Sequence, residues 1–503
     1  MNMQRSYIFF FLLSGMMLAA SCRTKLDVQP SHLVPEQKMW TTKNDARSAV
    51  FSAYALLRSA LADNNAWLVY GELRAGDFTS VSRGDLSAVT ANQLTASFPA
   101  LENWSNWRPF YAVIYQANLC LEKLETVHKN DFRYTEEEMK VDLAHVRFLR
   151  SLAYFYLVRI WGDVPLVTRA VSGEFVPLER APQARVLDMA AADAQAAAQA
   201  LPWKYDQQSP ELRSQYWGQP SAFWQGVIAG KGSAYMLLAH IAAWRGDYLS
   251  TDKFARLVID NRSKGGYALV NTTTLTGNGG VFTGQAEDIV FAMPFNKNYQ
   301  ESSASGHIEE WVLAEPFISK AQPDIFISND SILRIFDEPN DERFKVTDGG
   351  AGVGNYFTGF GNPVPLFSKI RLLSVTGANP LRSYQSAIVV FRYEELLLLR
   401  AEALLYLGKT GESAQVLNGV RGQRGIGEYK GPLSGLANAI LQERRRELLG
   451  EGWRWFDLVR FEKLEQYSRF SPADLANGAQ FWPISKSQLS SASPIQQNKY
   501  WQQ

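Results

Sequence analysis

The sequence predicts a mainly α-helical protein that is built from helical hairpins and carries a loop-rich insertion with a few short strands. Apolar residues recur with the spacing of an α-helix over most of the chain before residue 262 and after residue 388. Between these limits Gly, Asn, Ser and Thr are frequent, and the helical periodicity is poor. The two patterns together indicate a helical scaffold that is interrupted by one irregular region.

The composition fits a folded protein with a large core. Of 503 residues, 46% are hydrophobic and 20% are charged, which excludes global disorder. The net charge of +1 argues against a nucleic-acid partner, because such a partner requires a basic face. Cys22 and Cys120 are the two cysteines. We expect Cys120 to be a small buried hydrophobe, and no internal disulfide framework.

The first residues have the pattern of a bacterial lipoprotein signal peptide. A short basic stretch precedes the apolar run 7–20, which is too short to span a bilayer, and small residues then lead to Cys22. We therefore expect a signal peptide over 1–21, lipid on Cys22, and a tether over 22–43 that holds the protein to a membrane. The alternative is an ordinary secretory signal with a chance cysteine.

The first helix is expected from about residue 44 to residue 61, capped by Asn44 and Asp45. A polar, turn-rich stretch over 62–106 follows and is expected to be loop. Long loops in packed proteins are usually functional, so this segment is a candidate for ligand contact.

Three further helices are expected over 107–127, 135–160 and 181–201, and Pro165 marks the end of the second. The third is rich in alanine, the best helix former.

Two later segments resemble each other. Ala239 is followed seven residues on by Gly246, and Ala401 is followed seven residues on by Gly408. In each segment a helix of small and apolar residues ends at the glycine, and a second amphipathic helix begins a few residues later. Small residues let two helices approach closely, so the pattern predicts tetratricopeptide-like hairpins.

The irregular region over 262–388 shows one clear strand pattern, at residues 288–293. We expect the rest of this insertion to be loop-rich.

The most distinctive stretch of the chain covers residues 443–460. Glu443, Glu447 and Glu451 follow at intervals of four among several arginines, and the Gly450–Gly452 step precedes a cluster of aromatic residues. An unpaired buried charge is too costly to keep, so these residues predict a clamp of paired charges at a helix end inside the core.

This stretch closely resembles the ERRRELxFEGxRWFDLxR signature of the SusD/RagB family of bacterial surface lipoproteins, with Gly450 in place of the usual Phe. Other segments resemble further family motifs, in the family's order: 26–30, 147–166, 417–424, 482–484 and 497–500. The resemblance implies a single domain over 44–503. In it, tetratricopeptide-like hairpins form a right-handed superhelical scaffold, with ligand-facing loops at about 62–106 and an insertion at about 262–388.

The resemblance also implies a function. Such a protein is not an enzyme. It is lipid-anchored on the outer membrane at the cell surface, binds an oligosaccharide, and delivers it to a SusC-like TonB-dependent outer-membrane transporter. One alternative is an oligopeptide receptor of the RagB type. A lipid-anchored glycoside hydrolase is disfavoured, because no catalytic constellation is recognisable in the sequence.

The sequence indicates neither a resident cofactor nor a transition-metal site. None of the five histidines stands at metal-ligand spacing from another, and HExxH and CxxC motifs are absent. Oxygen-bearing side chains at 329–330 and 337–341 leave a structural calcium ion open.

The candidate ligand-binding residues lie in the regions where the family meets its ligands. They are Asn64, Asp77, Arg83, Trp104 and Trp311. Aromatic faces stack on sugar rings, while amide and charged groups hydrogen-bond to hydroxyls. The competing interpretations are that the two Trp pack in the core and that Asp77 pairs with Arg83 at the surface.

Two aromatic residues of the Gly-rich loop, Tyr356 and Phe360, are the next candidates. The Trp residues of helical segments are assigned to the core, namely Trp161, Trp244, Trp453 and Trp455.

Overall fold

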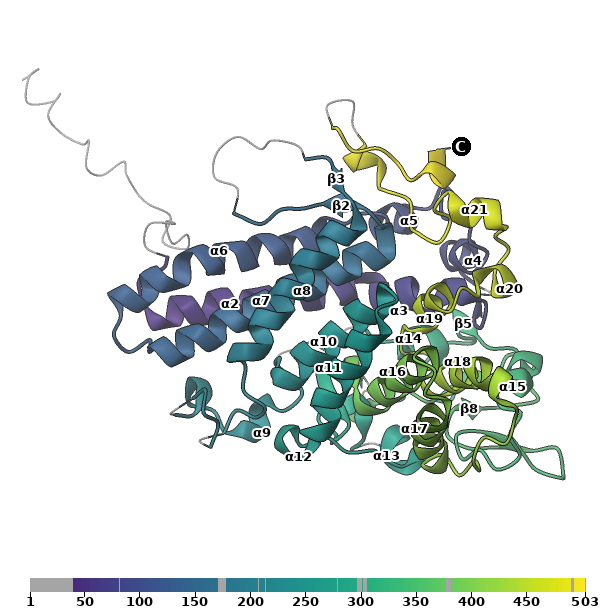
Figure 1. Cartoon of the computed structure of the whole chain (residues 1–503). Coiled ribbons are helices and arrows are strands. Elements are labelled where there is room, and N and C mark those ends of the chain that lie inside the picture. The colour runs from purple at the N-terminus through teal and green to yellow at the C-terminus, as the bar shows by residue number, and fades with distance from the viewer. Residues whose placement is uncertain are drawn as a thin grey trace, which may run out of the picture.

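The computed structural model confirms a mainly α-helical scaffold with short strands (Figure 1). It describes residues 39–502 apart from 81, 171–177, 207, 213, 278, 296–300, 302–304, 377–380 and 490–492. The expected signal peptide, the lipidated Cys22 and the tether up to residue 38 therefore lie outside the described residues.

Nine helices of 12 to 26 residues build the scaffold in the described part of the chain. They are α2 (Lys43–Ala62), α6 (Arg108–Asn130), α7 (Glu136–Trp161), α8 (Gln183–Ala200), α10 (Lys231–Trp244), α11 (Tyr248–Asp260), α16 (Tyr393–Tyr406), α17 (Thr410–Gly422) and α18 (Leu436–Glu447). In this order each helix packs on the next up to α17, and α18 packs on both α16 and α17. This succession of antiparallel neighbours is the expected tetratricopeptide-like superhelix.

Local sequence sets the ends of these helices. Thr42, and not Asn44, caps α2, because its side chain accepts from the Asp45 N–H while the Asp45 carboxylate accepts from the Thr42 N–H. The expected hairpin turns are confirmed at Gly246 and Gly408, which adopt φ values of 72° and 76° that favour glycine.

The segment 62–106 is not the loop that the sequence suggested. It folds into short elements: η2 (Asp63–Asn65), α3 (Ala66–Gly71), η3 (Leu73–Ala75), β1 (Thr79–Ser80), α4 (Gly84–Thr90) and α5 (Pro99–Trp104). Each is at most seven residues long, which is too short to show a helical period. Buried apolar side chains within them, such as Leu68 and Leu101, attach the segment to the core.

The insertion contains the short strands that the sequence predicted. Its elements are α12 (Arg262–Gly265), α13 (Thr272–Thr276), η5 (Val281–Thr283), β4 (Ile289–Met293), α14 (Glu309–Val312), β5 (Ile325–Phe326), α15 (Asn329–Ile335), β6 (Lys345–Val346), β7 (Gly352–Val353), β8 (Phe357–Thr358), β9 (Leu366–Phe367), β10 (Leu373–Thr376) and β11 (Leu381–Tyr384). The predicted strand is β4, which pairs antiparallel with β12 (Ile388–Arg392) and so joins the insertion to the scaffold.

The remaining short elements cover the ends of the scaffold. They are β2 (Val164–Pro165), β3 (Arg180–Ala181), η4 (Tyr216–Gly218), α9 (Ser221–Trp224), η7 (Leu433–Gly435), α19 (Arg454–Arg460), α20 (Leu464–Tyr467), α21 (Pro472–Ala476), η8 (Lys486–Gln488) and η9 (Lys499–Gln502).

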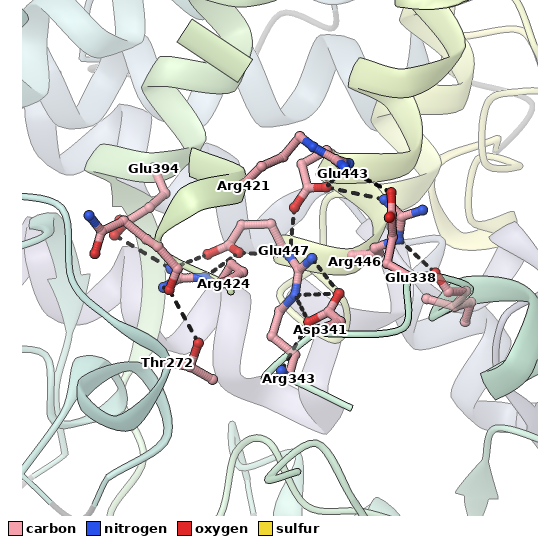
Figure 2. A network of polar contacts seen from close by, with 12 residues as sticks. Thr272, Glu338, Asp341, Arg343, Glu394, Arg421, Arg424, Glu443, Arg446 and Glu447 are labelled. Carbon is pink, nitrogen blue, oxygen red and sulfur yellow. Dashed lines mark hydrogen bonds and ion pairs between the residues drawn. The ribbon is translucent and has the colours of Figure 1, made fainter. Parts of the chain in front are cut away.

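A buried ion-pair network confirms the predicted charge clamp (Figure 2). Glu447 accepts hydrogen bonds from Arg343 Nη1 at 3.0 Å, Arg392 Nη1 at 2.8 Å, and Arg424 Nη2 and Nε at 2.8 Å each. Burial alone would raise the pKa of Glu447, but the charges of these three arginines hold it well below its usual range. One carboxylate thus ties the insertion, β12 and the turn after α17 to α18.

The turn after α18 is also fixed by a buried carboxylate. Glu72, at the end of α3, accepts backbone hydrogen bonds from Gly450 at 3.1 Å, Gly452 at 3.1 Å and Trp453 at 3.3 Å. Both glycines have positive φ, and a Cβ on Gly450 would lie 2.6 Å from the ring of Phe367. The family's usual Phe is therefore excluded here by the packing.

The expected burial of Cys120 and of three of the four helical Trp residues is confirmed. Cys120 is buried and free. The rings of Trp161, Trp453 and Trp455 are buried, and Trp244 is half-buried against the core.

We predict that Glu447→Gln lowers the free energy of unfolding at pH 7 by about 3–5 kcal/mol, because three buried guanidinium groups lose their shared counter-charge. The folded-state pKa of Glu447 is depressed, so its contribution is present above about pH 4 and is lost as the pH falls further. Urea denaturation measures both effects.

The matched control for this test is Glu428→Gln, in an exposed loop, which we expect to change stability by less than about 0.5 kcal/mol. Equal losses in the two variants would contradict a stabilising role for the network.

Candidate functional site

Four of the five predicted ligand residues come together in the structure. The rings of Trp104, at the end of α5, and Trp311, in α14, lie edge to face with centroids 6.5 Å apart. Trp104 Nε1 donates to the carbonyl of Asn64 at 3.2 Å, and the Arg83 guanidinium lies 5.2 Å from the Trp311 ring centroid. Positions far apart in the sequence thus form one cluster.

The two Trp rings of this cluster are covered. Trp104 is 2% exposed and Trp311 is 4% exposed, so neither presents an open face for a sugar. The exposed members are Asn64, whose backbone has left-handed φ, and Arg83, which is partly exposed. The role of these residues in ligand binding stays a prediction.

Asp77 lies apart from the cluster and is buried. It binds Arg445 through both carboxylate oxygens, and its Oδ2 lies 3.7 Å from Arg454 Nε. Arg83 pairs instead with Asp85. The expected alternative, a surface pair of Asp77 with Arg83, is therefore wrong, because the buried arginines of the 443–460 stretch take up the Asp77 charge.

The secondary candidates have packing roles. Tyr356 is buried, and Phe360 is half-buried against the ring of Phe344. In the segments proposed for calcium, Asp337 binds Arg446 and Asp341 binds Arg343. Within the described residues, no group of three or more His, Cys, Asp or Glu side chains is placed to hold a metal ion.

A cavity of about 770 Å³ lies beside α2, α9 and β4 and forms the best candidate for a ligand site. We call it the aromatic groove. Its walls include five aromatic side chains, Phe51, Tyr54, Phe223, Trp224 and Phe295. Its polar lining includes Arg58, Thr283, Gln285, Glu301 and Gln385.

Three of these rings, Phe51, Trp224 and Phe223, contact one another in series and form a wall. Phe51 stacks on Trp224 with centroids 5.6 Å apart and an interplanar angle of 12°. Phe223 meets the same Trp224 edge to face at 4.7 Å and is 52% exposed. An exposed ring beside a stacked pair offers an apolar surface to the face of a sugar.

Polar groups stand at the edge of this wall. Arg58 Nη2 lies 2.5 Å from Glu301 Oε1, and Nη1 donates to the carbonyl of Pro294 at 3.2 Å. Gln385 Nε2 is buried and has no hydrogen-bond partner among the described residues. It is a donor available to a ligand hydroxyl.

A buried hydrogen-bond chain holds the floor of the groove. Tyr205 Oη donates to the carbonyl of Ala229, so it accepts from His145 Nε2 at 3.0 Å. His145 Nδ1 then accepts from Tyr54 Oη at 2.7 Å, and Tyr54 Oη accepts from the Ala229 N–H at 3.0 Å. Burial lowers the pKa of His145 to about 3, so the imidazole is neutral and its tautomer follows from this chain. The Tyr54 ring is thereby locked in place.

The groove and the Trp cluster are joined by the same elements. Glu301 binds Arg58 on α2, and further along Ser305 Oγ donates to the carbonyl of Ala62 at 3.0 Å. Trp67 Nε1 then donates to the carbonyl of Gly306 at 3.2 Å, five residues before Trp311. The end of α2 and the described residues between 301 and 312 therefore connect the two regions.

The groove was not predicted from the sequence, although the sequence contains one signal for it. Phe51, Tyr54 and Arg58 repeat at i, i+3 and i+7, which marks a second stripe on the helix beside its alanine-rich core face. No comparable signal could have placed Phe223 or Phe295 against this stripe, because their approach depends on the tertiary fold.

Comparison with known proteins places the chain in a family. A family model described as "SusD family" matches residues 371–471, and one described as "Starch-binding associating with outer membrane" matches residues 27–217. The crystal structure of a SusD superfamily protein from Bacteroides thetaiotaomicron is 38% identical and superposes with a TM-score of 0.83, covering 92% of this chain and 99% of that chain. The chain belongs to the SusD superfamily.

Other SusD relatives are similar to this chain over comparable lengths. A SusD homologue from Bacteroides thetaiotaomicron is 26% identical, with a TM-score of 0.75, over 92% of this chain and 99% of that chain. A SusD-like protein of Formosa agariphila is 25% identical over 91% of each chain. SusD-like proteins are generally glycan-binding proteins associated with the outer membrane. Among the described helices, none has the length and apolar character needed to cross a membrane.

Glu309, two residues before Trp311, provides a pH-dependent test of this region. Its carboxylate accepts from Ser386 Oγ at 2.7 Å and from the Leu372 N–H at 3.2 Å, and burial raises its pKa to about 7. Because the folded-state pKa is raised, the stability that this group contributes is full below about pH 4.5 and is lost as the pH rises to about 7.

We predict that the free energy of unfolding of the parent protein falls by about 3 kcal/mol, relative to that of Glu309→Gln, between pH 4.5 and pH 8. Urea denaturation of both proteins across this range measures the difference. Parallel stability curves would contradict the raised pKa.

Proposed function

We propose that this chain is a cell-surface lipoprotein, anchored through Cys22, that captures an oligosaccharide and delivers it to a SusC-like TonB-dependent outer-membrane transporter. Membership of the SusD superfamily supports the glycan-binding role. The observation that carries the proposal is the aromatic groove, where exposed ring surface and polar groups line one cavity of suitable size.

The groove would bind a sugar in a simple way. One pyranose face would stack on Phe223, while hydroxyls would reach Gln285, Gln385 and the Arg58 guanidinium. A shallow site of this kind binds on the order of micromolar to millimolar. Weak binding suits a protein that must also release its ligand to a transporter.

The Trp cluster would extend the same surface. Asn64 and Arg83 are accessible and would meet the far end of a longer chain. Trp104 and Trp311 would act from below by holding these two residues in position.

The charges of the groove favour a glycan over an oligopeptide. Among its described lining residues, one base and one acid are present, and they already bind each other: Arg58 and Glu301. A peptide site would need unpaired charges to bind the termini of the peptide.

The lining of the groove also argues against catalysis. Hydrolysis of a glycosidic bond requires two carboxyl groups across the bond, and the described lining offers one. We therefore propose a binding protein without catalysis.

Phe223→Ala tests the groove directly. We expect it to weaken oligosaccharide binding by about tenfold, about 1.4 kcal/mol, because the exposed stacking surface is removed. Calorimetry of the purified protein against a glycan panel and a peptide digest measures it. The matched control is Phe132→Ala, a 90% exposed ring between α6 and α7 that does not line the groove.

Each outcome of this experiment has a distinct meaning. Equal affinity in both variants would place the site elsewhere, and binding to peptides alone would favour the oligopeptide receptor. Release of reducing ends from a bound glycan would contradict the absence of catalysis.

A further inference from the structure

A second cavity, of about 540 Å³, lies between α15, α18, α20 and the segment 75–77. We call it the arginine pocket, because Arg334, Arg445 and Arg446 line it. Figure 1 places α15, α18 and α20 at the far side of the molecule from α9, so the pocket is separate from the aromatic groove.

Two of the three arginines are held in place by carboxylates. Arg445 Nε donates to both oxygens of Asp77 at 3.1 Å, and Arg446 Nη2 lies 2.6 Å from Asp337 Oδ1. Both guanidinium groups are largely buried, whereas the Asp337 side chain is 65% exposed. The arginines are thus fixed in orientation, and one of their counter-charges, Asp337, is open to solvent.

Arg334 has no such counter-charge. Its guanidinium donates to Ser331 Oγ at 2.9 Å, and no carboxylate of the described chain lies within ion-pair distance. Its side chain is exposed at the mouth of the pocket. This charge is available to an incoming anion.

A fourth arginine lies directly behind the pocket. Arg454 is 3% exposed, and its Nε stands 3.7 Å from Asp77, the carboxylate that Arg445 already binds. Its Nε and Nη2 are buried without a hydrogen-bond partner among the described residues. One carboxylate therefore serves two guanidinium groups. Glu443 also pairs with Arg446 but is shared with other arginines, so the arginines around the pocket outnumber the carboxylates that pair with them.

The rest of the lining suits a sugar. The guanidinium of Arg454 lies 5.0 Å from the centroid of the Tyr467 ring, and Gln442 Nε2 donates to Tyr467 Oη at 3.0 Å. Two further amides, Asn438 and Gln466, face the same cavity. Amide groups pair with hydroxyls, and a half-buried tyrosine ring offers an apolar face.

We propose that the arginine pocket binds an acidic sugar unit. Arg334 and Arg445 would hold its carboxylate, Gln442 would bind its hydroxyls, and Tyr467 would lie against its ring. Planar guanidinium groups match the geometry of a carboxylate, and the cavity has the volume of a small-molecule site. This site is independent of the ligand that the aromatic groove takes.

The test is calorimetry of the purified full-length protein with sodium glucuronate, with glucose as the neutral counterpart, and with inorganic sulfate. We expect glucuronate to bind at least about tenfold more tightly than glucose, and Arg334→Gln to remove most of that difference. Arg185→Gln is the matched control, an exposed arginine on α8 that does not line the pocket. This control should leave the affinities for glucuronate and glucose unchanged.

A variant that is expected to strengthen binding distinguishes an effect on the site from damage to the fold. Asp337→Asn removes a negative charge from the lining of the pocket, so it should tighten glucuronate binding by about threefold. Equal affinity for glucuronate and glucose would overturn the proposal, as would unchanged binding in Arg334→Gln. Binding of sulfate without glucuronate would overturn the assignment to a sugar.

Discussion

The fold depends on one buried carboxylate, that of Glu447. Its three arginine partners come from the insertion, from β12 and from the turn after α17, so a single side chain at the end of α18 holds distant segments together. Such a network is stable only when it is complete, because each unpaired guanidinium would carry the cost of its own desolvation. This requirement makes the charged stretch 443–460 a constraint on the arrangement of the whole C-terminal half.

The constraint reaches the aromatic groove through two connections. Glu72 fixes the turn after α18 to α3, directly after the helix that forms one wall of the aromatic groove. Arg392 ends β12, whose partner β4 leads into Pro294 and Phe295 on the other wall. The groove lies where the scaffold and the insertion meet, and its two sides are held together by charged side chains that do not line the groove.

The long helices and the presence of a buried charge clamp could be predicted from the sequence, because both depend on residues that are close together in the chain. Long helices show their period, and the spacing of the glutamates after residue 443 indicated buried charge pairs. The partners of Glu447 could not be predicted, because the spacing of residues along one helix does not identify which distant arginines lie beside it in the fold. Trp104 and Trp311 were named as ligand candidates with core packing as the alternative, and their burial depends on neighbours that the sequence does not place. Phe223 was missed for the same reason, as it meets α2 only in the folded chain.

The aromatic groove is the proposed site of the glycan. The most direct measurement is a crystal structure of the protein soaked with an oligosaccharide that binds in solution. We predict a pyranose ring over Phe223, with a hydroxyl within hydrogen-bonding distance of Gln385 Nε2. Sugar density at another surface, with the groove filled by water alone, would contradict it.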